Sequence, residues 1–436
     1  MKPIKIGLLG LGTVGAGTFR VLRRNQQEII RRAGRGIEIS MIAVRDLPKA
    51  QAIVAGACEV VTDCLQVVNH PDIDIVVELM GGTEFTKELV LTAIANGKHV
   101  VTANKALLAI HGNEIFRAAQ DKGVMVAFEA AVAGGIPIIK ALREGLTANR
   151  IEWVAGIING TTNFILSEMR DKGLDFATVL KQAQELGYAE ADPTFDIEGV
   201  DAAHKATIMA AIAFGIPMQF DKAHVEGISA LQAIDINYAE QLGYRIKLLG
   251  IAKRTTKGIE LRVHPTLIPS NRLIANVEGA MNAVLVQGDA VGASMYYGRG
   301  AGAEPTASAV IADLVDITRL ATADPEHRVP HMAFQPDSIR QEVVLPMAEI
   351  TTSYYLRLSV ADQTGVLADV TRIMADFTIS IDAMLQKEPA QDETKTDIIM
   401  LTHQTQEKNV LAAIEKIEQL SSVYGQVTKI RLEQLS

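Results

Sequence analysis

The residues best suited to do chemistry lie in one short acidic segment that leads to a single lysine. Between Gly187 and Lys205 the sequence carries five carboxylates: Glu190, Asp192, Asp196, Glu198 and Asp201. Asp201 and Lys205 are four residues apart, so on a helix they share a face, and the carboxylate can hold the amine in place in its charged form. The alternative is an ordinary exposed ion pair, worth well under about 1 kcal/mol.

The surrounding pattern places this pair on a helix. Asp192-Pro193 predicts a turn, because proline moves the residue before it out of the helical region. After Gly199 the apolar residues recur at helical spacing: Val200, Ala203, Ala206, Met209, Ala210 and Ala213. Lys205 therefore lies among alanines and apolar side chains, where a plain surface charge is poorly placed. The acidic turn directly before it favours a functional site.

Length and composition indicate several globular domains. The chain has 436 residues, too many for one typical core. Its net charge of −9, without a cluster of basic residues and interleaved aromatics, argues against nucleic-acid binding. Cys58 and Cys64 match no zinc or redox spacing, so we expect free thiols in a reducing compartment. The apolar start, 6–11, is too short for a signal peptide or a membrane span, and we expect a soluble cytoplasmic protein.

A glycine motif at the amino terminus predicts a dinucleotide site. An apolar strand over 2–9 runs into Gly10-Leu-Gly12-Thr-Val-Gly15, and a helix from Val14 to about Ala33 follows. Gly10 permits the tight turn, Gly12 lets the backbone approach a pyrophosphate, and Gly15 lets the helix pack on the strand. The helix start then offers free N–H groups to the phosphates. A chance glycine turn is the alternative.

The next predicted strand, 37–44, ends at Arg45-Asp46, where the ribose of such a cofactor lies. An acidic residue there suits the 2′-hydroxyl of NAD, whereas an arginine suits the 2′-phosphate of NADP. Arg45 comes first, so NADP is favoured and use of both cofactors stays open. The alternative is that Arg45 is a solvated loop charge.

Three further apolar segments, 73–79, 99–102 and 124–128, predict a parallel, doubly wound sheet. Two of them end in Gly81-Gly82-Thr83 and Ala103-Asn104-Lys105, on the edge where ligands bind in such sheets. We expect Lys105 either to contact a phosphate or substrate or to point to water at a helix start.

The last of these strands ends at Glu129, beside a glycine-bearing loop that runs to Pro137. One carboxylate and several carbonyls of such a loop suit a hard cation. The residues alone favour a helix cap or a buried, hydrogen-bonded glutamate, because no second acidic ligand stands nearby.

The middle of the chain reads as a mixture of strands and helices. A strand pattern resumes at Ile151, and Asn159-Gly160-Thr161-Thr162-Asn163 opens a helix, either as a cap or as donors to a small polar substrate. Strand-like segments follow at 223–228, 245–253, 259–267 and 283–288. A glycine-rich stretch, 298–305, leads into a long helix, 306–321, which we expect to return to the nucleotide-binding domain.

Taken in order, these segments resemble the homoserine dehydrogenase family, whose members interconvert L-aspartate 4-semialdehyde and L-homoserine with NAD(P). The matching segments are GLGTVG at Gly10, TANKALLA at Thr102, EAAVAGGIP at Glu129, NGTTNFIL at Asn159, GYAEADPTFDIEGVDAAHK at Gly187 and GRGAGAEPTASAV at Gly298. They cover the chain through about Ala323, and the segment at Gly187 is long and specific. Because no aspartate kinase segment precedes residue 1, we expect a monofunctional enzyme.

The resemblance implies a role for individual residues. Lys205 would be the catalytic proton donor and acceptor, and Asp201 would orient it. The substrate-binding residues would be Glu190, which holds the amino group, with Asp196, Gly160, Thr161 and Lys105. The cofactor would lie against Gly10, Gly12, Thr13, Val14, Gly15, Arg45, Thr83, Lys105 and Gly302. A sodium ion would be held by the Glu129 side chain and by the carbonyls of Val132, Gly134 and Ile136.

The carboxyl-terminal end shows a second, smaller pattern. Residues 322–352 are rich in proline and are expected to form a linker. Predicted strands at 354–360, 379–386, 395–402 and 426–431, with helices at 366–376 and 410–420, give the ferredoxin-like order. Asp362-Gln-Thr-Gly365-Val-Leu367-Ala resembles the ACT domain, a module that senses small amino acids. That family usually carries proline before the glycine; here it is Thr364, which puts the rigidity of the loop and ligand binding there in question.

The expected architecture is therefore α/β with three domains. They are an N-terminal Rossmann-type doubly wound sheet (1–130, completed by the helix 306–321), an α+β substrate-binding and dimerisation domain (131–305) and, after the linker 322–352, a C-terminal ferredoxin-like ACT regulatory domain (353–436). Kinship implies a homodimer or homotetramer in threonine, methionine and isoleucine biosynthesis, with L-threonine as feedback inhibitor. An ACT module used only for oligomerisation is the alternative.

Two other functions stay open at this point. One is a different Rossmann dehydrogenase that acts on a small amino acid or semialdehyde. The other is a catalytically inactive amino-acid sensor that keeps both folds. Intact Lys205, Asp201 and Glu190 argue against a sensor, which has no need of a proton donor.

Overall fold

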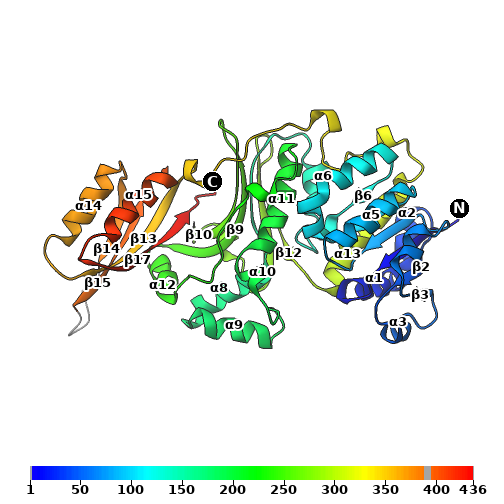
Figure 1. Cartoon of the computed structure of the whole chain (residues 1–436), viewed down its shortest axis with the longest axis horizontal. Coiled ribbons are helices and arrows are strands. Elements are labelled where there is room, and N and C mark those ends of the chain that lie inside the picture. The colour runs from blue at the N-terminus through cyan, green and yellow to red at the C-terminus, as the bar shows by residue number, and fades with distance from the viewer. Residues whose placement is uncertain (1, 387–393, 436) are drawn as a thin grey trace.

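A computed structural model describes residues 2–386 and 394–435 of the chain. Figure 1 shows three parts arranged along the long axis, with the N-terminal part at the right, the middle part at the centre and the C-terminal part at the left. Two sheets underlie them, one parallel and one mixed. The expected fold class, an α/β chain with a doubly wound sheet and a C-terminal ferredoxin-like domain, is confirmed.

The N-terminal part is a six-stranded parallel sheet with helices on both faces. Its strands are β1 (Ile4–Leu9), β2 (Ile37–Ala43), β3 (Glu59–Val61), β4 (Ile75–Glu78), β5 (His99–Thr102) and β6 (Val126–Ala127), in the spatial order β3-β2-β1-β4-β5-β6. One face packs against α1 (Thr13–Arg24), α2 (Gln26–Ala33), α3 (Leu47–Val54) and α13 (Ala303–Leu320). The other face packs against α4 (Cys64–Asn69), α5 (Glu84–Ala95) and α6 (Lys105–Lys122).

Helix α13 reaches this sheet from far along the sequence. Its buried residues Ala307, Val310 and Leu314 share a core with Ile6 and Leu8 of β1. It also lies directly on α1: a Cβ added to Gly17 would come within 2.3 Å of the Ala303 carbonyl oxygen. Glycine at position 17 therefore permits the close approach of the two helices.

One helix predicted for this part is wrong in detail, and one short strand was missed. The single helix expected from Val14 to about Ala33 is two helices, α1 and α2, which are separated at Asn25. Asn25 ends α1 and precedes α2 with a backbone conformation outside the helical region, and asparagine favours such positions. The three-residue strand β3 was not predicted, because so short a segment shows no periodicity.

The middle part and the C-terminal part share one mixed, 11-stranded sheet. The middle strands are β7 (Ile151–Ile157), β8 (His224–Val225), β9 (Tyr244–Arg254), β10 (Ile259–Pro269), β11 (Met281–Gly288) and β12 (Gly292–Arg299). The helices are α7 (Ile138–Lys140), α8 (Gly160–Lys172), α9 (Phe176–Glu185), α10 (Thr194–Ile197), α11 (Val200–Phe214) and α12 (Ala233–Gln241). Shorter helical turns are η1 (Glu129–Ala131), η2 (Ala141–Gly145), η3 (Phe220–Lys222) and η4 (Leu273–Asn276).

Sequence reasoning missed several elements of the middle part, among them α9, β12 and α12. Strand β12 begins with a glycine and is only partly buried, so its pattern is weak. Helix α12 carries Ile234, Ile236 and Tyr238 at alternate positions, which is a strand period on a helix. The predicted strand at 223–228 is also shorter than expected, since only His224 and Val225 pair with β10.

The C-terminal part has the predicted β-α-β-β-α-β order. It comprises β13 (Thr351–Ala361), α14 (Val366–Asp376), β14 (Ile381–Gln386), β15 (Lys395–Thr402), the short β16 (Thr405–Gln406), α15 (Glu407–Glu418) and β17 (Val423–Leu432). The strand order β17-β13-β15-β14 is that of a ferredoxin-like sheet. Strand β17 also pairs in parallel with β10, through Thr266–Arg431 and Leu267–Leu432, so this sheet continues the sheet of the middle part.

Residues 322–352 run between these parts with three short 3-10 turns: η5 (Pro325–His327), η6 (Pro336–Ser338) and η7 (Met347–Glu349). Val344 forms a bridge with Ile259 at the start of β10, so the segment is also attached to the mixed sheet.

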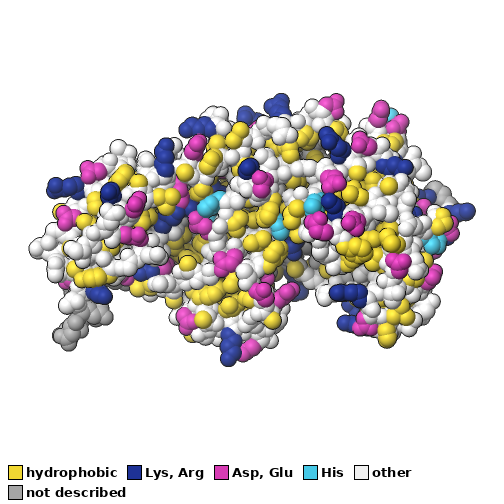
Figure 2. All heavy atoms as spheres, viewed as in Figure 1, with side chains coloured by type: hydrophobic (Ala, Val, Ile, Leu, Met, Phe, Trp, Pro, Cys, Tyr) yellow, Lys and Arg dark blue, Asp and Glu magenta, His cyan; other side chains and the backbone are white. Residues whose placement is uncertain are grey.

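Cys58 and Cys64 are free thiols. Within 2–386 and 394–435, helices with the length and hydropathy needed to cross a membrane are absent. On the face shown in Figure 2, acidic and basic side chains are interspersed.

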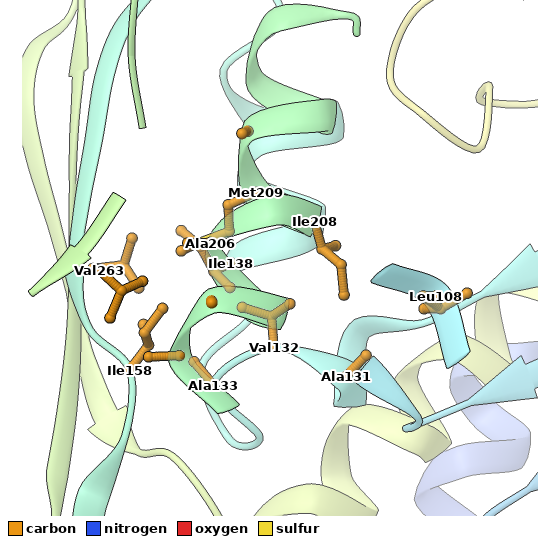
Figure 3. Packing of buried hydrophobic residues seen from close by; sticks show 14 of the residues in the cluster. Leu108, Ala131, Val132, Ala133, Ile138, Ile158, Ala206, Ile208, Met209 and Val263 are labelled. Atoms are coloured by element: carbon orange, nitrogen blue, oxygen red, sulfur yellow. The ribbon is translucent and has the colours of Figure 1, made fainter. Parts of the chain in front are cut away.

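Helix α11 lies between the two sheets and is buried along its whole length. Figure 3 shows Ala206 of α11 near Val263 of β10 and near Ile158, which directly follows β7. Ile208 points to the opposite side, toward Leu108 and Ala131. A helix with apolar contacts on two sides is fixed in position, and so are the polar side chains that it carries.

Candidate active site

The centre of the site is a cluster of three charged side chains at the start of α11. The Lys205 Nζ donates to Asp201 Oδ2 at 2.6 Å and to the Ile158 carbonyl at 2.7 Å. The Nζ of Lys105, the first residue of α6, lies 3.0 Å from the other Asp201 oxygen. Asp201 and Lys205 are 3% and 9% exposed, so the pair is not the exposed helical ion pair considered as an alternative. The structure brings Lys205, Asp201 and Lys105 together.

Burial and mutual attraction set the protonation states of this cluster. Burial lowers the pKa of Lys205, although the Asp201 carboxylate opposes that shift. Burial alone would raise the pKa of Asp201, but the two neighbouring lysines hold it below its ordinary value. The Asp201 carboxylate raises the pKa of Lys105 against the effect of burial. Of the two lysines, Lys205 thus loses its proton more easily, which suits a general acid and base.

Asn159 connects the lysine cluster to a second carboxylate. Its Nδ2 donates to Asp196 Oδ1 at 2.6 Å and to Asp201 Oδ2 at 2.9 Å. Its Oδ1 accepts the Thr162 backbone N–H at 2.9 Å and caps α8, so the side chain is held from both ends. Burial, and the nearby charge of Asp201, raise the pKa of Asp196.

The other expected substrate residues surround this cluster. The Thr161 hydroxyl donates to the Tyr188 carbonyl at 2.7 Å and lies 3.4 Å from Asp196 Oδ2. Gly160 has no room for a side chain, because an added Cβ would lie 2.8 Å from the Ala280 carbonyl oxygen. Glu190 is exposed, and its charge is among those that raise the pKa of Lys105.

Two aromatic rings and a histidine lie beside the lysines. The Lys105 Nζ is 5.9 Å from the centre of the Phe195 ring, within range of a cation–π contact. His204 packs between Phe195 and Phe220, with ring centres 5.4 and 4.3 Å away. Its buried Nδ1 has no hydrogen-bond partner among the described residues, and burial lowers its pKa to about 4. His204 is therefore neutral at pH 7.

A cavity of about 740 Å³ lies at the carboxyl ends of the parallel strands, the edge predicted for a cofactor. It is lined by Gly10, Leu11, Gly12, Ala43, Val44, Arg45, Asp46, Lys49, Ala50, Thr62, Asp63, Cys64, Leu79, Met80, Gly81, Gly82 and Phe85. Gly10 turns with φ +94°, and an added Cβ there would lie 2.9 Å from the Leu79 carbonyl oxygen. At Gly12 an added Cβ would meet open space, which leaves room for a ligand above the backbone. The crevice thus fits a dinucleotide.

The predicted cofactor residues differ in how close they lie to the crevice. Gly10, Gly12 and Arg45 line the crevice itself. Gly15 packs α1 on the strand, because an added Cβ would lie 2.2 Å from the Gly10 carbonyl oxygen. Thr13, Val14, Thr83 and Gly302 are not among the lining residues: they stand at the starts of α1, α5 and α13.

Hydrogen bonds join the loop that lines the crevice to the start of α6, which carries Lys105. The Asn104 side chain donates to the Gly82 carbonyl at 2.7 Å and accepts the Leu107 N–H, and so caps α6. The buried Glu78 carboxylate accepts the Met80 N–H at 2.9 Å and the Thr102 hydroxyl at 2.6 Å. The loop that lines the crevice and the helix that begins with Lys105 are therefore held by the same side chains.

Glu129 forms a separate buried site near α7. Its two carboxylate oxygens accept the N–H groups of Ile139 at 2.9 Å and Lys140 at 2.8 Å, so it caps this helix. Burial raises its pKa to about 7. Ala133 and Gly134 both have positive φ, as expected of a loop that turns its carbonyls in a new direction. An all-oxygen set of this kind suits a hard cation, and each carboxylate oxygen keeps a second lone pair.

Comparisons with known proteins agree with this geometry. The family model for homoserine dehydrogenase matches residues 137–315, and the model for its NAD-binding domain matches residues 10–129. A homoserine dehydrogenase of Pseudomonas aeruginosa is 61% identical over the full length of both chains. The chain belongs to the homoserine dehydrogenase family. A solved homoserine dehydrogenase of Thiobacillus denitrificans is 70% identical with a TM-score of 0.96, and the match covers 100% of this chain and 99% of that one.

Membership of the homoserine dehydrogenase family makes the chain an oxidoreductase that uses a nicotinamide cofactor. The ACT family model matches residues 354–421, as expected from the segment at Gly365. An ACT domain indicates that an amino acid binds this part of a homoserine dehydrogenase. A mutant of a hyperthermophilic archaeal homoserine dehydrogenase, solved with NADPH, is 25% identical with a TM-score of 0.63, over 74% of this chain and 99% of that one.

Sequence reasoning missed several residues that complete the site. The segment at Asn159 was predicted as a helix cap or as a set of substrate donors, but the bridge that Asn159 forms between Asp196 and Asp201 was not predicted. The Ile158 carbonyl and the Glu78 carboxylate gave no signal, because their partners are far away in sequence. Lys49 and Asp63 line the crevice only because α3 and the unpredicted β3 lie there.

Proposed function

We propose that the chain interconverts L-aspartate 4-semialdehyde and L-homoserine, with Lys205 as the proton donor and acceptor. The observation that carries the proposal is the position of the Lys205 ammonium, which is 9% exposed and lies 2.6 Å from Asp201 Oδ2 and 2.7 Å from the Ile158 carbonyl. Two acceptors fix the direction of an amine that burial has made more acidic.

The chemistry needs a positioned acid. A bound nicotinamide supplies the hydride that reduces the aldehyde carbon, or accepts it in the reverse direction. Negative charge then develops on the substrate oxygen, and the Lys205 ammonium stabilises that charge and donates its proton. Asp201 and Asn159 hold the lysine in place, and Lys105 adds a second positive charge on the same side.

The amino-acid end of the substrate would lie against the remaining polar residues. We assign the substrate ammonium to Glu190 and Asp196, with Gly160 and Thr161 lining the same site. Glu190 is exposed, and Asp196 keeps its place through Asn159. Acidic side chains opposite two lysines suit a zwitterionic amino acid, because they offer a partner to each charged end.

NADP is the cofactor that we favour over NAD. Arg45 and Lys49 are exposed and line the crevice at the end of β2, where two cations suit a 2′-phosphate. Gly10, Gly12 and the first turn of α1 with Thr13 and Val14 would hold the pyrophosphate. A mutant of a hyperthermophilic archaeal homoserine dehydrogenase was solved with NADPH, so a related fold accommodates the 2′-phosphate.

The other parts of the proposal come from kinship. L-threonine would bind the ACT domain and inhibit the enzyme in threonine, methionine and isoleucine biosynthesis. The loop before α14 turns at Gly365 with φ +96°, which glycine adopts without strain even though Thr364 replaces the usual proline. A sodium ion at Glu129, Val132, Gly134 and Ile136, a homodimer or homotetramer, and a cytoplasmic location stay predictions.

The test is homoserine-dependent reduction of NADP⁺ by the Lys205→Ala variant. We expect kcat to fall by about 10² to 10⁴, the usual contribution of a positioned acid or base, while cofactor affinity stays the same. Lys98→Ala is the matched control, because Lys98 is also a buried lysine that donates to backbone carbonyls, those of His70 and Ile73. An equal loss of cofactor binding in Lys205→Ala, or an equal loss of kcat in the control, would contradict the role.

A further inference from the structure

The last strand of the C-terminal domain makes a buried ion pair with the middle domain. Arg431 of β17 is 1% exposed, and its Nη1 and Nη2 lie 2.7 and 2.8 Å from the two oxygens of Glu226. The Arg431 Nε also donates to Glu407 of α15 at 2.9 Å. A bidentate arginine–carboxylate pair fixes orientation as well as distance. Glu226 is therefore held by the C-terminal domain, although it belongs to the middle domain.

The backbone around Glu226 is in turn attached to the segment that carries the substrate residues. The Glu226 N–H donates to the Val263 carbonyl of β10 at 2.8 Å. Two residues on, the Ile228 N–H donates to the Ile197 carbonyl at 2.8 Å. Between them, Gly227 has no room for a side chain, because an added Cβ would lie 2.5 Å from the same Ile197 oxygen. The two segments are thus in direct backbone contact.

That contact lies between the two carboxylates of the site. Ile197 ends α10 directly after Asp196, and Gly199 precedes α11, which carries Asp201. A movement of residues 226–228 would therefore be transmitted to Asp196 and to the start of α11. The path consists of one ion pair and one backbone hydrogen bond. Strand pairing with β10 positions both partners of the ion pair, because Arg431 lies in β17 and Glu226 directly follows β8.

We propose that Glu226 is a positioning residue for the substrate site, and that Arg431 holds it in place from the C-terminal domain. This inference rests on the proposed placement of the substrate at Asp196. It gives the C-terminal strand a part in substrate binding even when no amino acid is bound to that domain. The expected consequence is a rise in KM for the amino-acid substrate that exceeds any loss of kcat, with the cofactor KM preserved. Asp196 directly precedes Ile197, whereas Asp201 is also held by Asn159 and Lys105.

A second ion pair at the same junction provides a matched control. Arg262 of β10 is also 1% exposed, and it pairs with Glu433, just after β17, at 2.7 Å. Glu226→Ala leaves Arg431 paired with Glu407, and Glu433→Ala leaves Arg262 paired with Glu260. Each variant removes one carboxylate from a buried arginine at the domain junction. Of the two glutamates, Glu226 is the one whose neighbouring backbone contacts Ile197, next to Asp196.

The experiment measures KM for L-homoserine, KM for NADP⁺, kcat and Tm for both variants in the full-length chain. Glu226→Ala should raise the homoserine KM by about three- to ten-fold, and Glu433→Ala should leave it unchanged at a similar loss of Tm. Glu226→Gln keeps the shape of the side chain and a neutral acceptor for Arg431, so its KM should lie between those of wild type and Glu226→Ala. It also decides the matter if Glu226→Ala does not fold.

An equal KM in the Glu226→Ala and Glu433→Ala variants overturns the inference, as does a loss of Tm in Glu226→Ala without a rise in KM. Asp196→Asn separates this failure from that of the proposed function. If Asp196→Asn raises the homoserine KM and Glu226→Ala does not, the substrate site stands and only the positioning role is wrong. If neither variant changes KM, the substrate does not lie at Asp196, and both proposals fail.

Discussion

The lysine cluster and the cofactor crevice are adjacent, yet they are built in opposite ways. Asp201 and Lys205 are nearly fully buried, and they bind each other. The Asp201 carboxylate also binds Asn159 and Lys105, and the Lys205 Nζ also donates to the Ile158 carbonyl. Arg45 and Lys49 are exposed at the wall of an open cavity of about 740 Å³. The same kinds of side chain are therefore fixed in one region and free to adapt in the other.

The difference follows from what each region has to do. Proton transfer depends on the distance and direction of one N–H group, and these are held best where burial strengthens each interaction. Recognition of a phosphate tolerates some motion, because a long cationic side chain can reach it from several rotamers. Substitutions in the buried region should therefore change kcat strongly, and substitutions in the crevice should change cofactor KM weakly.

Among substitutions that compare the two regions, the largest effect is expected for Asp201→Asn. The substitution removes the negative charge shared by Lys205 and Lys105, so Lys205 loses its orientation and part of its charge. We expect kcat to fall by about 10² in both directions of the reaction. Asp63→Asn is the control in the crevice, since Asp63 caps α4 and asparagine caps a helix equally well.

That comparison of the two regions would be wrong if the two aspartate variants lost kcat equally. A thermal scan of both variants is needed beside the kinetics. Removal of one partner from a buried ion pair costs about 3–5 kcal/mol of folding free energy, so only protein that is folded at the assay temperature counts.

A smaller effect is expected in the pH profile of homoserine oxidation, in which Lys205 must be neutral to accept a proton. Its pKa is below the ordinary 10.5, so kcat should rise with pH to a midpoint below 10.5. The positive charge of Lys105 contributes to that lowering, and Lys105→Gln should therefore move the midpoint upward. Asp201→Asn should move it downward. Lys49→Gln in the crevice should leave the midpoint of the pH profile unchanged. A shifted midpoint in this variant would show that charges in the crevice affect the pKa of Lys205.

The smallest effect is expected for Arg45→Ala. An exposed charge is worth up to about 1 kcal/mol, so KM for NADPH should rise by about five-fold while KM for NADH stays constant. The wild-type preference should also weaken as salt is added, because exposed charges are screened. Arg31→Ala is the control, since Arg31 is also an exposed arginine and lies on α2. An unchanged ratio of the two KM values in Arg45→Ala would remove Arg45 from the cofactor site.

The sequence predicts those features that depend on near neighbours. Asp201 and Lys205 share a helix turn, and Gly10 to Gly15 form one local turn, so spacing alone places them. The ferredoxin-like domain is also predicted, because each of its strands and helices has its own period. Contacts between residues that are distant in sequence are not predicted in this way. Lys105 and the Ile158 carbonyl meet Asp201 and Lys205 only because α11 packs between two sheets.

Features at the domain junction are beyond prediction for the same reason. Glu226 and Arg431 carry no motif, and their contact exists because β17 pairs in parallel with β10. The predicted linker gave no sign that Val344 would join the sheet at Ile259. Strand pairing between distant segments is set by the whole core, which a single sequence does not display.

The most direct test of proton transfer by Lys205 is a crystal structure of the enzyme with L-homoserine and NADP⁺. We expect the homoserine hydroxyl to lie about 2.6–3.2 Å from the Lys205 Nζ, with the substrate ammonium beside Asp196 and Glu190. A hydroxyl bound to another side chain, with Lys205 still bonded only to Asp201 and the Ile158 carbonyl, would contradict the assignment.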